Sequence, residues 1–123
     1  MINIVNATQH VATQEQKEAR VWDLEPEIHE VLQNLLTFSS LEETLDVTDR
    51  VEKIVSLLNA TGALIICKGV MIGGAPYLMG PLADALKAIG SNPVFAYSNR
   101  VSTEDPVTGI KTSTFKHLGF VQG

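Results

Sequence analysis

Short apolar runs alternate along this chain with longer stretches of helical periodicity, and this alternation limits the folds open to it. We expect the runs at residues 2–5, 63–67 and 94–97 to form strands. The run at 63–67 is bounded by Gly62 and by Lys68-Gly69, which is typical of a central strand buried on both faces. Strands separated by helices pair in parallel through right-handed crossovers. The pattern therefore predicts a small Rossmann-like α/β domain with a short parallel sheet.

Helical stretches fill most of the chain between these strands. Thr13 and Gln16 have the spacing of a capping box, which predicts a short helix that ends near Val21. Apolar residues at helical spacing predict a second helix after Pro26 and a third that ends near Leu58. Since helices are expected on both faces of the sheet, we predict a three-layer arrangement.

The last third of the chain combines an interrupted helix with a hairpin. Apolar positions between 78 and 89 predict a helix, and Pro81 either kinks it or restarts it. Residues 99–104 and 110–116 flank a turn at 105–109, so they predict a C-terminal β-hairpin or an extension of the sheet. No repeat or linker interrupts this order, and we expect one domain over residues 1–123.

Composition excludes several functions. The 14 acidic and 9 basic residues give a net charge of −5, which argues against general binding to DNA or RNA. No apolar run approaches the ~20 residues of a membrane span, and no signal peptide is recognisable, so we expect a cytoplasmic protein without membrane contact. Cys67 is the single cysteine and is expected to be buried, and the three histidines lack metal-ligand spacing. The sequence thus predicts neither a metal nor a cofactor.

Three polar segments follow the predicted strands, where open α/β sheets bind their ligands. His10 suits proton transfer or a hydrogen bond to phosphate, although an inert surface histidine is an equal alternative. Gly73 and Gly74 allow close approach of backbone amides to a phosphate, or serve the turn alone. Arg100 is suited to bidentate phosphate binding, with a solvated surface position as its alternative. The candidate residues are Asn6, Thr8, Gln9 and His10, then Lys68, Gly73, Gly74 and Tyr77, then Ser98, Asn99 and Arg100.

These same segments carry a family resemblance. Residues 93–100, Gly109 and residues 114–120 resemble the ending of small CRISPR-associated ring-nuclease-like proteins, which have a CARF-like variant of the Rossmann sheet. Residues 6–10 with 13–16 are similar to that group's first strand and loop, and residues 68–77 to its central loop. About half of the chain takes part. The loop at Gly73-Gly74-Ala75-Pro76 is more constrained than this group's pattern, which puts cleavage in question more than binding.

The resemblance implies a homodimer that binds a cyclic oligoadenylate, the tetramer in particular, and cleaves it without a metal by attack of a ribose 2′-hydroxyl. It assigns catalysis to His10, Arg100 and Lys68, and ligand binding to the other candidates. Asn6, Thr8 and Gln9 would hold ribose or base, and Tyr77 would stack on adenine.

Two other functions remain open at this stage. The same site in a non-catalytic protein would act as a sponge that lowers the free concentration of the cyclic nucleotide. Alternatively, the C-terminal hairpin would pair by its edge with a partner or a second copy, which makes the chain an interaction module.

Overall fold

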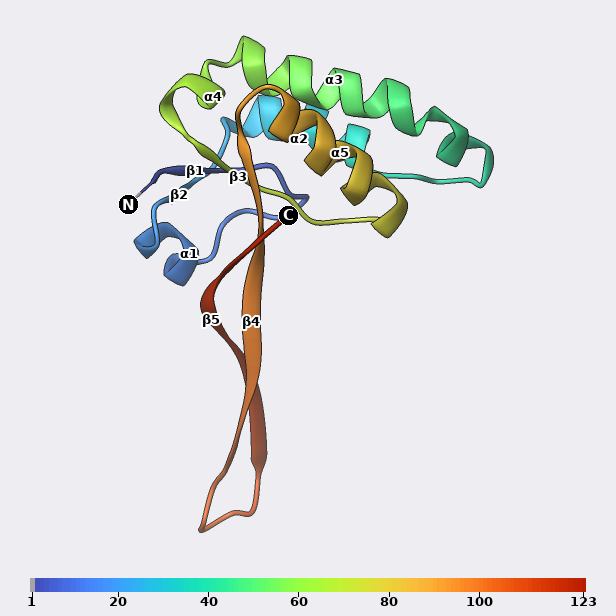
Figure 1. Ribbon diagram of the computed structural model, residues 1–123. Helices are drawn as coiled ribbons and strands as arrows, with labels where there is room; N and C mark the ends of the chain where they lie inside the picture. Colours follow the sequence, from blue (N-terminus) through green and yellow to red (C-terminus); the bar gives the residue numbers. More distant parts are fainter. Residues whose placement is uncertain (1) are drawn as a thin grey trace.

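The computed structural model describes residues 2–123, and for residues 99–103 and 113–115 it describes the backbone alone. A helical body carries a long hairpin that projects away from it (Figure 1). In chain order the elements are β1 (Ile4–Asn6), α1 (Gln14–Glu18), β2 (Val21–Trp22), α2 (Pro26–Leu36), the 3-10 helix η1 (Glu42–Asp46), α3 (Val47–Ala60), α4 (Ala63–Ile66), β3 (Gly69–Met71), α5 (Pro76–Ala88), β4 (Asn92–Glu104) and β5 (Lys111–Gln122).

The five strands form one mixed sheet in the order β2-β1-β3-β4-β5. The first four are parallel, and β5 runs antiparallel to β4. The chain leaves β1 toward β2 on one side, whereas β3 and then β4 are added on the other side, so the strand order reverses between β1 and β3. The predicted α/β class and C-terminal hairpin are confirmed, and the sheet is parallel only up to β4.

One strand was not predicted. Residue 21, expected at the end of a helix, begins β2, because α1 already ends at Glu18. The capping box between Thr13 and Gln16 that starts α1 is present as expected. Arg20 then adopts a left-handed backbone with φ 72°, which turns the chain into the sheet.

The predicted central strand at 63–67 is wrong. Residues 63–66 form the single turn α4, in which Ile65 and Ile66 are 81% and 71% exposed, and the strand lies at Gly69–Met71. A Cβ at Gly69 would lie 2.9 Å from Cγ1 of Ile4, so the close approach of β1 and β3 requires glycine there. Cys67 is buried as expected.

The helices cover the sheet unequally. Figure 1 shows α2, α3 and α5 over one face, where they bury the main core with Leu32, Ile54 and Leu82 fully enclosed. The other face buries a smaller cluster that includes Met71 of β3 and Ala12 from the loop before α1, whereas α1 itself buries no residue. The expected third layer is therefore only a loop and a five-residue helix. Pro81 lies within a single helix, α5.

The hairpin is longer than predicted. β4 pairs with β5 from Val94 opposite Gln122 to Glu104 opposite Lys111, whereas only its first residues, Asn92 to Val94, pair with β3. At the tip, the amides of Val107 and then Thr108 donate to the Asp105 carboxylate and hold its pKa below the ordinary value. In the described residues, no helix is long and apolar enough to cross a membrane.

Candidate functional site

A pocket of about 460 Å³ lies where the strand order reverses, and we call it the switch-point pocket. The loop after β1 contributes Thr8, Gln9 and His10 to its wall. Gly73 and Gly74 come from the loop after β3. The remaining wall is formed by Val11, Thr13, Gln16, Met71, Ile72, Phe95 and Ala96. The pocket therefore opens at the carboxyl ends of the parallel strands, which is where we expected a ligand from the sequence.

The loop after β1 is organised around Asn6, the one buried polar residue among those described, which is 1% exposed. Its Nδ2 donates to the Asp23 carboxylate at 2.8 Å and to the His10 carbonyl at 2.7 Å. Its Oδ1 accepts from the Thr8 amide at 3.0 Å and lies 2.7 Å from the Thr8 hydroxyl. Asn6 thus fixes the loop through its buried side chain and does not line the pocket.

Helix α2 fixes the outer side of the same loop. Nε2 of His29 lies 2.9 Å from the Thr8 carbonyl, and Nε2 of Gln33 donates to the Gln9 carbonyl at 2.7 Å. Because backbone positions 8, 9 and 10 are each hydrogen-bonded, the pocket wall is preorganised. Sequence analysis missed both helix residues. Their signal is a pair of polar side chains one turn apart on an amphipathic helix.

The described wall of the pocket combines apolar side chains with several neutral polar groups. Among its described wall residues, none is Lys, Arg, Asp or Glu, and one, His10, is a histidine. No hydrogen bond in the described part of the chain uses the amides of Gly73 or Gly74. The described wall therefore offers an imidazole, hydroxyl and amide groups, and backbone donors beside its apolar side chains.

Comparison with known families gives one match, a model that covers residues 2–121 and is described as the uncharacterized protein MJ1673 family. The chain belongs to this family. No curated protein and no solved structure matches the chain. For this member of the MJ1673 family, the assignment of a site therefore rests on geometry.

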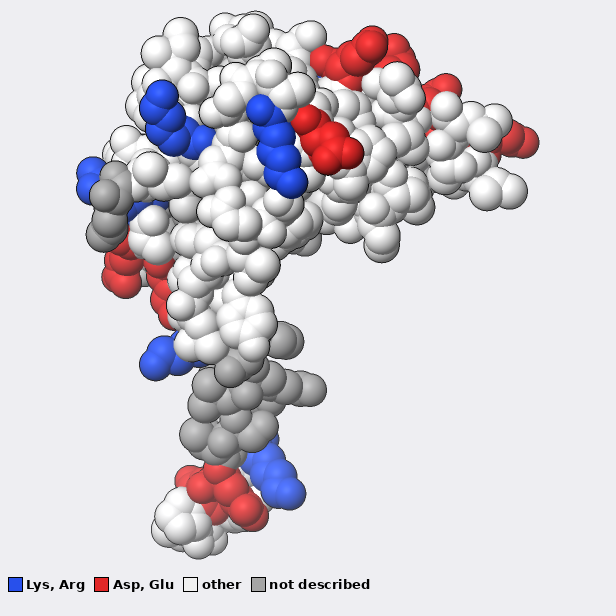
Figure 2. All heavy atoms as spheres, in the orientation of Figure 1, with Lys and Arg blue, Asp and Glu red and all other residues white. Residues whose placement is uncertain are grey.

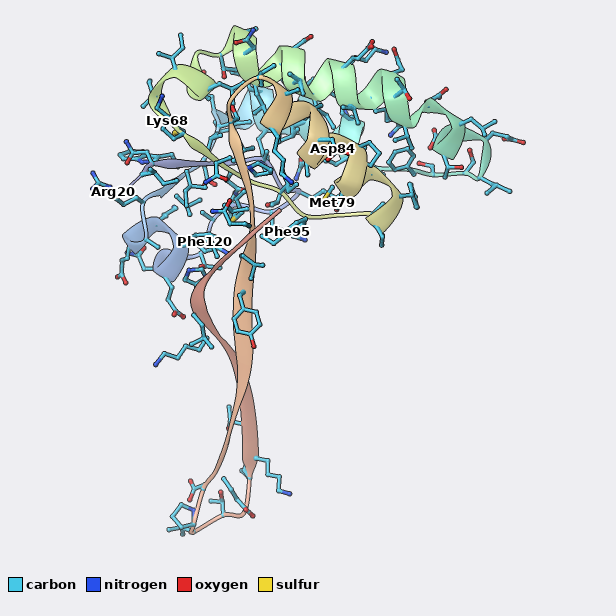
Figure 3. The ribbon with its side chains drawn as sticks, in the orientation of Figure 1. Arg20, Lys68, Met79, Asp84, Phe95 and Phe120 are labelled. Carbon is cyan, nitrogen blue, oxygen red and sulfur yellow. The ribbon has the colours of Figure 1, made fainter. Side chains whose placement is uncertain are left out.

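Five predicted site residues meet in the pocket of this family member: Thr8, Gln9, His10, Gly73 and Gly74. Lys68 does not, because it precedes β3 and so lies at the opposite end of the strand from the pocket, as Figure 3 shows. Its predicted place followed from the strand assigned to 63–67, which would have put Lys68 at a carboxyl end. This arrangement separates Lys68 from His10 along β3 and does not support a shared role at one phosphate.

Tyr77 also lies outside the pocket wall. Its ring packs edge-on against Phe38, with centroids 5.2 Å apart, and the Arg50 guanidinium lies 4.2 Å from the Phe38 centroid. Arg50 in turn donates to the last carbonyls of α2, including that of Leu35 at 3.3 Å. Tyr77 therefore belongs to a cluster that ties the start of α5 to the end of α2.

The third predicted segment lies on β4 beyond the pocket. Ser98 is exposed and follows the bulge between Tyr97 and Ser98. The backbone of Asn99 and Arg100 continues β4, opposite Lys116 and Phe115, and both side chains lie outside the described residues. Arg100 comes four positions after Ala96, which is about 13 Å along an extended strand.

A second pocket, of about 290 Å³, lies between β2 and α4. Its wall is mostly apolar and includes Trp22, Ile66 and Cys67. Burial raises the pKa of the Cys67 thiol, so this cysteine is an inert wall residue at neutral pH rather than a nucleophile. No group of potential metal ligands occurs among the residues that the structure describes.

Proposed function

We propose that the protein binds a nucleotide in the switch-point pocket, and that a cyclic oligoadenylate, in particular the tetramer, is this ligand. The observation that supports the proposal most is the position of a pocket with a preorganised polar loop at the reversal of strand order between β1 and β3. Doubly wound α/β folds with the order 2-1-3-4 bind nucleotides at this point. On this proposal, the domain is a reduced Rossmann-like fold of the CARF-like kind.

The pocket is large enough for only one part of the ring. Its volume of about 460 Å³ falls in the lower half of the range for small-molecule sites, ~300–1,000 Å³. It is too small for a ring of four nucleotides, so a symmetric ring would use one pocket from each of two chains. This is the arrangement expected from the family resemblance.

The groups in the wall match a nucleoside and one phosphodiester. Gln9 and His10 can hydrogen-bond to ribose or base, and the amides of Gly73 and Gly74 can donate to a phosphate oxygen. Gln9 is held by an Nε2 contact to the Thr37 hydroxyl at 3.1 Å, which leaves its Oε1 free in the described structure to accept. A phosphodiester carries one negative charge, which these neutral donors can bind without a lysine or arginine.

Cleavage would use His10 in the proposed reaction. His10 takes the proton from a ribose 2′-hydroxyl, the 2′-oxygen bonds to the adjacent phosphorus, and the bond to the 5′-oxygen breaks. The 5′-oxygen takes up a proton, which leaves a linear product with a 2′,3′-cyclic phosphate. The described pocket wall contains no lysine or arginine for the charge that develops on phosphate, and the Arg100 side chain lies outside the described residues, so the sponge stays the alternative.

The test is incubation of the purified protein with cyclic tetra-adenylate in EDTA, with binding followed by calorimetry and products by chromatography. We expect binding by the wild type, at least tenfold weaker binding by Gly73→Val, and unchanged binding by Lys68→Ala, since Lys68 lies at the other end of β3. If cleavage occurs, His10→Ala slows it more than it weakens binding. Binding without product establishes the sponge. Absence of binding by the wild type contradicts both forms of the proposal.

A further inference from the structure

The distal hairpin, residues 96–120, extends beyond the sheet, and we call it the arm. Within the described backbone, β4 has no strand on its β3 side past Val94, and β5 has no neighbouring strand on its outer side. Figure 1 shows no helix over either face of the arm. An isolated two-stranded ribbon is at best marginally stable in water, and both edges present unpaired amides and carbonyls. The arm therefore requires an additional contact.

The charge distribution favours a second copy of this chain as that contact. Only two of the fourteen acidic residues lie in the arm, whereas it holds three of the nine basic residues, Arg100, Lys111 and Lys116. The rest of the chain is strongly acidic, and Figure 2 shows acidic side chains gathered on the helical body. A slightly basic arm is thus complementary to the body of another copy, whereas two bodies repel each other.

Apolar residues lie at both ends of the arm. At its tip, Val107 and Ile110 are 90% and 64% exposed. Near its base, Tyr97, Leu118 and Val121 are each about half exposed. If two arms lie antiparallel, the tip of each reaches the base of the other, so the apolar tip meets the apolar base and the basic strand meets the acidic body.

We propose that the arm is a dimerisation element in which the free edges of two β5 strands pair antiparallel about a two-fold axis. Identical strands paired this way satisfy the same row of backbone groups on both chains, which makes a closed, isologous contact. The edge has little protection against such pairing, since β5 contains no proline and only two lysines. This inference does not depend on nucleotide binding.

The first test is the mass in solution by light scattering over a range of concentrations. We expect the wild type at twice the 13.3-kDa chain mass. A shortened variant that joins Ser98 directly to its neighbour His117 through Asn-Gly should be a monomer with a body that unfolds as in the wild type, because Ser98 and His117 are already paired. Val107→Glu should weaken the dimer at least tenfold, and Leu41→Glu, equally exposed but on the body, should not.

The second test is cross-linking of mixed single-cysteine variants with a short bismaleimide. Antiparallel arms predict that Lys111→Cys chains link to Val121→Cys chains more than either links to itself, while buried Cys67 stays unreacted. A wild-type monomer at every concentration, an open series of larger assemblies, or a dimer that survives removal of the arm would overturn the proposal. Efficient self-linking of both variants would overturn the antiparallel arrangement.

Discussion

Asn6 at the end of β1 donates through Nδ2 to the Asp23 carboxylate just after β2, at 2.8 Å. Oδ1 of Asp23 also accepts from the Ala12 amide at 2.9 Å. These two contacts connect the carboxyl ends of neighbouring parallel strands to the loop between them. The shape of the switch-point pocket therefore depends on a side chain that a ligand in the pocket does not touch.

Asn6→Ala should destabilise the protein by about 2 kcal/mol, because the buried amide is lost and the Asp23 carboxylate and the His10 carbonyl lose their donor. Asn6→Asp should cost at least as much at neutral pH, since it places a second carboxylate against Asp23. Burial and that charge raise the pKa of the new carboxyl in the folded state, so the cost should shrink as the pH falls. Urea unfolding measures both, with the exposed Asn34→Ala as control. A cost that does not vary with pH would argue against the carboxylate contact.

His29→Leu and Gln33→Leu should each weaken nucleotide binding severalfold, although neither residue lines the pocket. Each change frees a carbonyl of the loop after β1, at Thr8 or Gln9, and the loop must then be ordered when the ligand binds. Calorimetry with cyclic tetra-adenylate is the measurement, and the neighbouring exposed Glu30→Ala is the control. Equal affinities for all three variants would show that the loop does not need α2.

Gly73→Ala and Gly74→Ala separate backbone strain from contact with ligand. Gly74 has φ 147°, a conformation reserved for glycine, so Gly74→Ala should cost ~1–3 kcal/mol of stability. At Gly73 a Cβ would lie 3.6 Å from Thr8 Cγ2, an ordinary contact, so Gly73→Ala should be nearly neutral for stability but weaken ligand binding. Thermal unfolding and calorimetry check the pair. A Gly73→Ala variant with normal affinity would assign both glycines to the turn alone.

Cys67 should make stability fall in alkaline solution. Burial raises the pKa of its thiol in the folded state, so its contribution is complete below the unfolded pKa of about 8.5 and is lost as the pH rises through the folded value. Unfolding by urea at pH 7 and at pH 10 should therefore show a larger loss for the wild type than for Cys67→Ala. The same loss in both proteins would mean that other groups account for it.

Periodicity predicted the helices of this fold well, because α2, α3 and α5 each bury one apolar stripe against the sheet. Periodicity failed where an apolar residue is exposed or a glycine is buried. Ile65 and Ile66 are apolar yet exposed, whereas Gly69 is buried in β3 because only glycine fits beside Ile4. No local pattern distinguishes these cases, since the partner strand is more than 60 positions away.

The candidate site likewise contains residues that could be placed from the sequence and residues that could not. His10, Gly73 and Gly74 were placed correctly because they follow β1 and β3 directly, and the carboxyl ends of parallel strands meet at one edge. Lys68 was misplaced with its strand. His29 and Gln33 could not be assigned to the site from sequence, because their role depends on the packing of α2 beside a loop 21 and 24 positions earlier.

The most direct test of the switch-point pocket as the ligand site is an NMR titration of the ¹⁵N-labelled protein with cyclic tetra-adenylate. The account predicts the largest amide shifts at Gln9, His10, Gly73 and Gly74, and none at Trp22 or Ile66 in the second pocket. Shifts confined to the second pocket or the arm, or no shifts at all, would contradict it.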